Sequence, residues 1–172
     1  MCILESERLI LRRLRPSDVT ALAVWLSDYD VAKMTARIPY PYNEDDALDF
    51  VARGQGADHV FVVERKDDGV FLGEITLHED GEFGYWLGKP FWGFGYATEA
   101  AGRLVTHAFT ALGWDRLNAG WFCDNPASGR VLAKLGARHN GSAMRFSAAR
   151  GQAVLCHDML LTRADFLRKQ AA

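Results

Sequence analysis

The sequence of 172 residues has few cysteines, no excess of basic residues and no long apolar run, and each absence excludes a class of protein. Its three cysteines, Cys2, Cys123 and Cys156, are widely separated and form no CxxC pair. That pattern argues against a disulfide framework and against a zinc site, so we expect reduced thiols and no metal ion. With a formal net charge of −2, the chain lacks the basic surface that binds a phosphate backbone, and no nucleic acid partner is expected.

Membrane and secretory signals are also missing. No stretch approaches the ~18 apolar residues of a membrane span. The start, MCILESERLILRRLR, mixes charged and apolar residues and lacks the apolar core of a signal peptide. We therefore expect a cytoplasmic protein with no membrane partner. No linker or repeat divides the chain, so residues 1–172 are expected to form one domain.

What the sequence does contain is a clear order of strand and helix patterns. The runs HVFVVERK, VFLGEITLH and GEFGYWLG are separated by two turns that end in Asp-Gly, 67–69 and 79–81, which predicts an antiparallel meander. Strands are also expected in RLILRRL, RLNAGWF and AVLCHDMLLT. Helices are expected after Pro16, Asn43, Gly95 and Asn125, with a short one at the C-terminus. The order predicts an α/β (α+β) fold, while residues 137–153 follow no pattern.

The stretch FWGFGYATEA, residues 91–100, places two glycines directly before a helix. The first N–H groups of a helix have no internal partner, and the helix dipole adds positive character there. This geometry binds phosphate or pyrophosphate, and glycine lets the anion approach the amides. A tight turn in which the glycines serve only the shape of the chain explains the stretch equally well.

Two common phosphate motifs do not fit this stretch. Gly93 and Gly95 match the start of a dinucleotide fingerprint, but Thr98 occupies the place of the third glycine. Asp115 lies at a suitable distance for a ribose contact, yet it precedes the next strand instead of ending it. The Gly-Lys-Ser/Thr of a Walker loop is absent. A preceding antiparallel meander also disfavours both parallel-sheet folds.

Together with WFCDNPASGRVLAKLGA, residues 121–137, the stretch GYWLGKPFWGFGYATEA resembles the GNAT superfamily of N-acetyltransferases. More narrowly, nearly the whole chain is similar to the Rim-type branch, which acetylates ribosomal-protein N-termini. The superfamily motif Gln/Arg-x-x-Gly-x-Gly/Ala reads here as Trp92-x-x-Gly95-x-Ala97, with Trp92 in place of the usual polar residue. The resemblance implies a central, mostly antiparallel mixed sheet of six to seven strands flanked by helices. It also implies a V-shaped splay between the fourth and fifth strands.

The resemblance also implies where acetyl-CoA, the co-substrate, would bind. The amides of residues 94–98 would hold its pyrophosphate, and its pantetheine arm would lie between the splayed strands, near Leu87. Arg130 or Lys134 would meet the 3′-phosphate. The cofactor-binding residues expected on this basis are Trp86, Leu87, Trp92, Gly93, Phe94, Gly95, Tyr96, Ala97, Thr98, Asn125, Ser128 and Arg130.

Acetyl transfer to an amine needs a group that takes a proton and one that returns it to the thiolate. Ser128 is the expected proton donor, and the Leu87 amide is the expected oxyanion donor. Glu82 shares a strand face with Gly84 and Trp86 and is the expected base. Glu74, His78 and His157 are alternatives, and a solvated carboxylate or an exposed histidine explains each of these residues as well. Some members of the superfamily have no dedicated base.

The expected function is transfer of an acetyl group from acetyl-CoA to a protein N-terminal amine or a small primary amine. Two rivals stay open: a non-catalytic acyl-CoA sensor on the same fold, and a nucleotide- or phosphate-binding enzyme. Tyr40 and Tyr42 are candidates for the wall of the acceptor pocket, although such rings equally often pack a loop. The family also suggests a homodimer.

Overall fold

The computed structural model describes residues 3–54 and 59–171, and Cys2 lies outside this part of the chain. Two antiparallel sheets, of five and three strands, form its centre. The five-stranded sheet has the order β1-β2-β3-β4-β5 and the three-stranded sheet the order β6-β8-β7. The strands are β1 Leu4–Glu5, β2 Leu9–Arg12, β3 Val60–Arg65, β4 Phe71–Leu77, β5 Phe83–Leu87, β6 Arg116–Phe122, β7 Arg138–Ser147 and β8 Gln152–Thr162.

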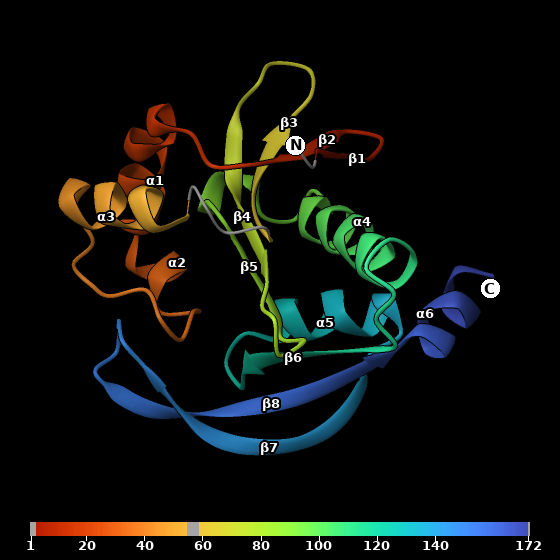
Figure 1. Cartoon of the computed structure of the whole chain (residues 1–172). Coiled ribbons are helices and arrows are strands. Elements are labelled where there is room, and N and C mark those ends of the chain that lie inside the picture. The colour runs from red at the N-terminus through yellow and green to blue at the C-terminus, as the bar shows by residue number, and fades with distance from the viewer. Residues whose placement is uncertain (1–2, 55–58, 172) are drawn as a thin grey trace.

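Helices cover both faces of the five-stranded sheet (Figure 1). The helices α1, α2 and α3 lie on one side of it and α4 on the other, while α5 packs beside β6. The helices are α1 Val19–Leu26, α2 Tyr29–Ala32, α3 Glu44–Gly54, α4 Tyr96–Thr110, α5 Pro126–Leu135 and α6 Arg163–Gln170, with 3-10 turns at Pro16–Asp18 and Lys89–Phe91.

The two faces of the five-stranded sheet bury separate apolar clusters. Alternation along β5 explains the division, because Leu87 packs with α4 in the larger cluster while Trp86 packs with α1 and α3 in the other. The two expected Asp-Gly turns join β3 to β4 and β4 to β5 as an antiparallel meander. The predicted class, antiparallel sheet flanked by helices, is confirmed.

The described part of the chain has eight strands, compared with the six to seven expected. The short β1 and the long β7 account for the difference. Almost every residue of β7 is exposed, so this strand has none of the apolar alternation by which a strand is found in a sequence.

The fourth and fifth strands predicted from the sequence are β5 and β6, and the two sheets part between them. Within the described ranges, their bridge is the isolated parallel pair Glu82–Asn118, supported by the Asn118 N–H donating to the Gly81 carbonyl at 2.8 Å. Beyond this point the strands diverge into different sheets. The divergence leaves two strand edges facing an opening.

Candidate active site

A cavity of ≈ 750 Å³ occupies this opening. It runs from the segment before α4, between β5 and β6, to the segment that follows α2. Of the predicted site residues it is lined by Glu82, Trp86, Leu87, Trp92, Gly93, Gly95, Tyr96, Ala97, Thr98, Asn125, Ser128 and Arg130. Lys134 also lines it, whereas Phe94 does not. The structure thus brings together residues that are more than forty positions apart in the sequence.

The edge of β5 presents free main-chain groups to the cavity. The Gly88 N–H donates to the Leu72 carbonyl at 2.8 Å, which makes Gly73 and Leu87 a non-hydrogen-bonded pair in the β4–β5 ladder. The N–H and C=O of Leu87, and by alternation those of Tyr85, therefore point away from β4 and toward the opening. A chain that carries amides can pair with such an edge.

The edge of β6 also presents main-chain groups to the opening. The Cys123 N–H donates to the Leu155 carbonyl at 2.9 Å, so Phe122 and Cys156 are a non-hydrogen-bonded pair. The main-chain groups of Phe122 and Gly120 then point away from β8. The Asn125 N–H occupies the Phe122 carbonyl at 2.7 Å, which leaves Gly120 free. Two polar edges flanked by apolar side chains fit the amide-bearing pantetheine arm that the resemblance implies.

The segment before α4 has the geometry of an anion site. Gly93 and Gly95 have φ of 85° and 83°, which only glycine adopts readily. Gly95 is the N-cap of α4 and gives it no side-chain cap, so the first amides of the helix stay available. A methyl group added at Gly93 would meet no atom within 4 Å, so the loop is open on that side. These features fit a diphosphate.

Trp92 fastens this loop to the end of β5. Its indole N–H donates to the Leu87 carbonyl at 2.7 Å, and 42% of the residue stays exposed. The side chain thus packs the loop against the strand. Because Trp92 occupies the Leu87 carbonyl, the Leu87 N–H is the group left for a ligand.

The other two rings of the loop have different surroundings. Tyr96 is buried in the larger core, and the Arg8 guanidinium lies 4.6 Å from the centre of its ring. Phe94 is 60% exposed and stacks on Tyr96 at 6.0 Å between ring centres. Only the main chain of Phe94 is therefore placed to serve the anion site.

The start of α5 brings a serine and a tyrosine together. Asn125 caps the helix, since its side chain accepts from the Ser128 N–H at 3.3 Å. The Ser128 hydroxyl lies 2.8 Å from that of Tyr85. Burial raises the pKa of Tyr85 to about 12, against a smaller opposing effect of the Ser128 hydrogen bond, so the phenol is protonated at neutral pH. Sequence reasoning missed Tyr85, although alternation along β5 places it on the face opposite Gly84.

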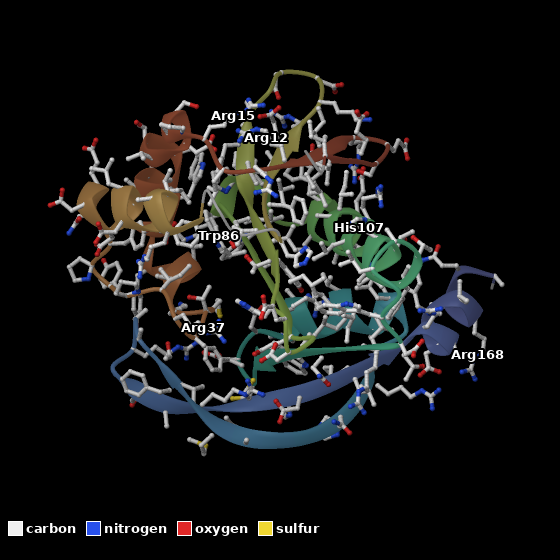
Figure 2. All side chains as sticks on the ribbon, in the orientation of Figure 1. Arg12, Arg15, Arg37, Trp86, His107 and Arg168 are labelled. Carbon is white, nitrogen blue, oxygen red and sulfur yellow. The ribbon has the colours of Figure 1, made fainter. Side chains whose placement is uncertain are left out.

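Glu82 is engaged by two arginines. Arg145 Nη1 lies 3.3 Å from Glu82 Oε1, and Arg37 Nη2 lies 3.7 Å from Glu82 Oε2. Arg145 also binds Asp158 at 2.6 Å. Figure 2 shows Arg37 and Trp86 on the side of β4 and β5 that carries α2, with Arg37 nearer to β8. Neither arginine was a predicted site residue, because one lies in a loop and the other in the unpatterned segment.

The competing carboxylate, Glu74, also lines the cavity and is buried. Its carboxylate accepts from the Trp86 indole at 3.2 Å and from the Thr76 hydroxyl. Burial raises the pKa of Glu74, while these two hydrogen bonds act in the opposite direction. Glu74 therefore keeps its proton to a higher pH than an exposed glutamate.

The remaining candidates differ in position. His78 lines the cavity, with its Nε2 3.1 Å from Arg37 Nη1. His157 lies outside the lining and packs on the Trp121 ring at 4.5 Å between ring centres. Tyr40 and Tyr42 do not line the cavity either; Tyr42 is buried in the core beside α3. Neither ring therefore faces this cavity, and a tyrosine wall of the acceptor pocket stays a prediction.

Two further properties concern only residues 3–54 and 59–171. Their helices are all too short or too polar to cross a bilayer. They contain no group of three or more His, Cys, Asp or Glu side chains placed to hold a metal ion. Cys123 and Cys156 are both free thiols.

Comparison with known proteins agrees with this geometry. A family model described as an acetyltransferase (GNAT) domain matches residues 8–138. The uncharacterized N-acetyltransferase YoaA of Bacillus subtilis is 29% identical over 164 residues, which cover 87% of this chain and 90% of YoaA.

Solved structures show the same architecture. The crystal structure of a GNAT-family acetyltransferase from Bacillus anthracis superimposes with a TM-score of 0.84 at 25% identity, covering 94% of this chain and 98% of that one. Mycobacterium smegmatis RimJ, solved in complex with CoA-disulfide, has a TM-score of 0.78 at 20% identity and covers 95% of this chain and 88% of its own, which shows a shared fold. Since the family model spans most of the sequence, the chain belongs to the acetyltransferase (GNAT) family.

Proposed function

We propose that the protein transfers an acetyl group from acetyl-CoA to a primary amine within the ≈ 750 Å³ cavity. The observation that carries this proposal is the meeting of two separate sequence elements, the loop before α4 and the start of α5, on one cavity. Neither a nucleotide-binding enzyme nor a simple turn requires Asn125 and Ser128 to stand opposite a glycine-rich anion loop. The CoA-disulfide bound to RimJ, which has the same fold, supports the choice of cofactor.

In this proposal different residues bind the pyrophosphate, the pantetheine arm and the 3′-phosphate of the cofactor. The amides of residues 94–98 hold the pyrophosphate at the start of α4. The pantetheine arm pairs with the free edges of β5 and β6, at the Leu87 N–H and at Gly120. Arg130 and Lys134, on the exposed side of α5, supply positive charge for the 3′-phosphate. The thioester then lies between the end of β5 and Ser128.

The reaction is a direct transfer. The amine nitrogen, once deprotonated, attacks the thioester carbon and forms a C–N bond while the C–S bond breaks. The Leu87 N–H stabilises the oxyanion of the intermediate. The departing thiolate takes the Ser128 hydroxyl proton, and Tyr85, at 2.8 Å, replaces that proton from its phenol. After the attack the nitrogen loses its second proton to a base, solvent returns a proton to the Tyr85 phenolate, and the products are the N-acetyl amine and CoA.

The base proposed from the sequence is Glu82, and the structure adds a constraint to its role. Both of its oxygens are engaged by guanidinium groups, so proton uptake requires that one of them moves or that a water molecule relays the proton. Glu74 is the competing base, because burial raises the pKa of its carboxyl above that of an exposed glutamate. The pH profile of kcat/KM separates the two, since the acidic limb disappears only in the variant that lacks the true base.

A thiol-release assay with acetyl-CoA against a broad panel of amines and peptides tests the proposal, with the variants Glu82→Gln, Glu74→Gln and Ser128→Ala. Calorimetric titration with acetyl-CoA is performed in parallel. Binding with no thiol release from any amine would indicate the acyl-CoA sensor. Protection against heat by ATP or NAD, but not by acetyl-CoA, would indicate the nucleotide-binding rival. No acetyl-CoA binding at millimolar concentration would end the proposal.

A further inference from the structure

An open space lies above Gly84 on the sheet face that α2 and α3 cover. The register places Gly84 opposite Thr76, in the row next to the buried pair Glu74 and Trp86. Gly84 is exposed, and a methyl group added there would meet no atom within 4 Å. Its φ is outside the left-handed region, so the backbone does not require glycine. The absence of a side chain is needed neither for conformation nor for packing, and its effect is to leave the floor of the cavity open.

Much of the wall around this space is apolar, although Thr76, opposite Gly84, and His78 also line the cavity. The apolar side chains come mainly from α2, the segment after it, α3 and β3, and they belong to the same cavity as the predicted catalytic residues. The residues concerned are Val31, Met34, Ile38, Phe50, Val60 and the ring of Trp86. An apolar body bound here replaces water along these side chains, which favours binding.

Charged side chains lie at the two ends of this space. Glu74, one row beyond Gly84, is the buried carboxylate of this wall. At the other end, Arg37 and Arg145 flank Glu82. A second cavity of ≈ 300 Å³, which Asp80 and Asp158 also line, shares Glu82 and Arg145 with the first, and Arg145 pairs with both Glu82 and Asp158 where the two cavities meet. A cation extended toward the second cavity would have to pass the Arg145 guanidinium.

We propose that the space above Gly84 is the acceptor subsite and that it takes an amine with a single positive charge on a flat or unbranched apolar body. This inference rests on the proposed function. The apolar body lies over Gly84 against the walls, and the reacting ammonium lies at the Glu74 end of the space, in the row next to Leu87. A second ammonium would lie among apolar side chains or beside two guanidinium groups, and both positions are costly.

Two measurements test the subsite. The first is kcat/KM by thiol release for 2-phenylethylamine, 1,5-diaminopentane and spermidine, together with peptides that begin with Phe or with Asp. We expect a preference of about 10-fold or more for the apolar monoamine over the diamine. A higher kcat/KM for the Phe peptide than for 2-phenylethylamine would identify a protein N-terminus, and not a free amine, as the acceptor of this subsite. A preference for the diamine or spermidine would overturn the inference.

The second measurement uses Gly84→Ala and Gly84→Val. Both side chains fill the floor, so KM for 2-phenylethylamine should rise by about 10-fold or more for the valine variant, while KM for acetyl-CoA stays unchanged. Gly102→Ala is the matched control, because it adds the same methyl group on α4, where the nearest atom is 3.7 Å away. An unchanged amine KM in the Gly84 variants would overturn the subsite.

Calorimetric titration of the CoA-saturated protein with 2-phenylethylamine makes the result independent of turnover. If the protein acetylates other amines but does not bind this one, the subsite is wrong and the proposed function stands. If it turns over no amine, the proposed function is wrong. The subsite is then judged by binding alone, and 2-phenylethylamine binding that Gly84→Val abolishes would support it.

Discussion

Arg8 Nε lies 2.7 Å from Glu99 Oε2, which joins the residue before β2 to the first turn of α4. The same carboxylate accepts from the Ser6 hydroxyl at 2.8 Å and from the Arg8 N–H at 2.7 Å. Arg8 Nη1 also donates to the Phe94 carbonyl at 3.1 Å. A carboxylate one turn inside α4 stabilises the helix but repels a diphosphate at its start. Arg8 offsets that charge and fixes the loop.

Removal of Arg8 should therefore weaken acetyl-CoA binding. For Arg8→Ala we expect Kd to rise about 10-fold at low salt, because Glu99 is left unpaired near the bound diphosphate. Glu99→Gln alone should change Kd by less than about 3-fold. The double variant Arg8→Ala/Glu99→Gln should recover most of the loss. Calorimetry measures these Kd values. If the double variant binds acetyl-CoA as weakly as Arg8→Ala does, Arg8 acts by fixing the conformation of the loop and not by offsetting the charge of Glu99.

The hydrogen bond between Tyr85 and Ser128 predicts a graded loss of the acid function. We expect kcat to fall by about 100-fold for Ser128→Ala, which lacks the donor, and by about 10-fold for Tyr85→Phe, in which the serine loses its proton supply. Kd for acetyl-CoA should stay within about 2-fold of the wild type. Tyr40→Phe, outside the cavity, is the control. Full activity in both site variants would remove Ser128 from the mechanism.

The two halves of the candidate site could be predicted because their signals are local. Glycines before a helix and an Asn-Pro helix start are read from a few consecutive residues, and the structure confirms both helix starts. Tyr85 was within reach of the same reasoning. Its place on β5 follows from alternation, but its partner lies 43 residues further along the chain, and no local pattern joins the two.

The surroundings of Glu82 could not be predicted in this manner. Arg145 belongs to β7, a strand exposed along nearly its whole length, where no burial pattern constrains the sequence. Arg37 lies in the segment between α2 and α3 and reaches Glu82, which directly precedes β5, across the cavity that both residues line. Local patterns thus predicted the residues that α4 and α5 bring to the cavity, whereas the surroundings of Glu82 depend on contacts between distant segments.

Burial of Glu74 predicts that stability falls as pH rises. The pKa of this carboxyl is raised above its ordinary value of 4.5, so the folded protein binds a proton that the unfolded chain releases. The contribution of this one group is therefore fully present below pH 4.5 and is lost as pH rises through the raised pKa of the folded state. Glu74→Gln has no proton to release, so its Tm should exceed that of the wild type at neutral pH and approach it in acid.

Thermal melts across the range from about pH 4 to about pH 8 measure this difference. Glu79→Gln, on the exposed turn before β5, is the matched control for the loss of one negative charge. A difference between Glu74→Gln and the wild type that does not grow with pH would show that the carboxyl is already ionised at its site. In that case the argument from a raised pKa for Glu74 as the base would also fail.

Gly73 and Gly84 form a matched pair on adjacent strands, with opposite expectations. A methyl group at Gly73 would lie 2.1 Å from the Trp86 carbonyl oxygen and 2.8 Å from the Leu87 Cα, so β5 would have to move away from β4. Because these contacts are with backbone, we expect Gly73→Ala to lower the free energy of unfolding by about 3 kcal/mol, and Tm by roughly 10 °C. The same methyl group at Gly84 meets open space, and Gly84→Ala should change stability by less than about 0.5 kcal/mol.

Displacement of β5 should also disturb the edge of this strand that faces the cavity. Leu87 is the cross-strand partner of Gly73, and its N–H is the group proposed to face the thioester. Gly73→Ala should therefore raise KM for acetyl-CoA even where the variant is folded, whereas Gly84→Ala should leave it unchanged. Denaturant unfolding, followed by kinetics well below the melting temperature, separates the two effects. A stable Gly73→Ala variant with normal acetyl-CoA kinetics would show that β4 and β5 can part without disturbing the edge that faces β6.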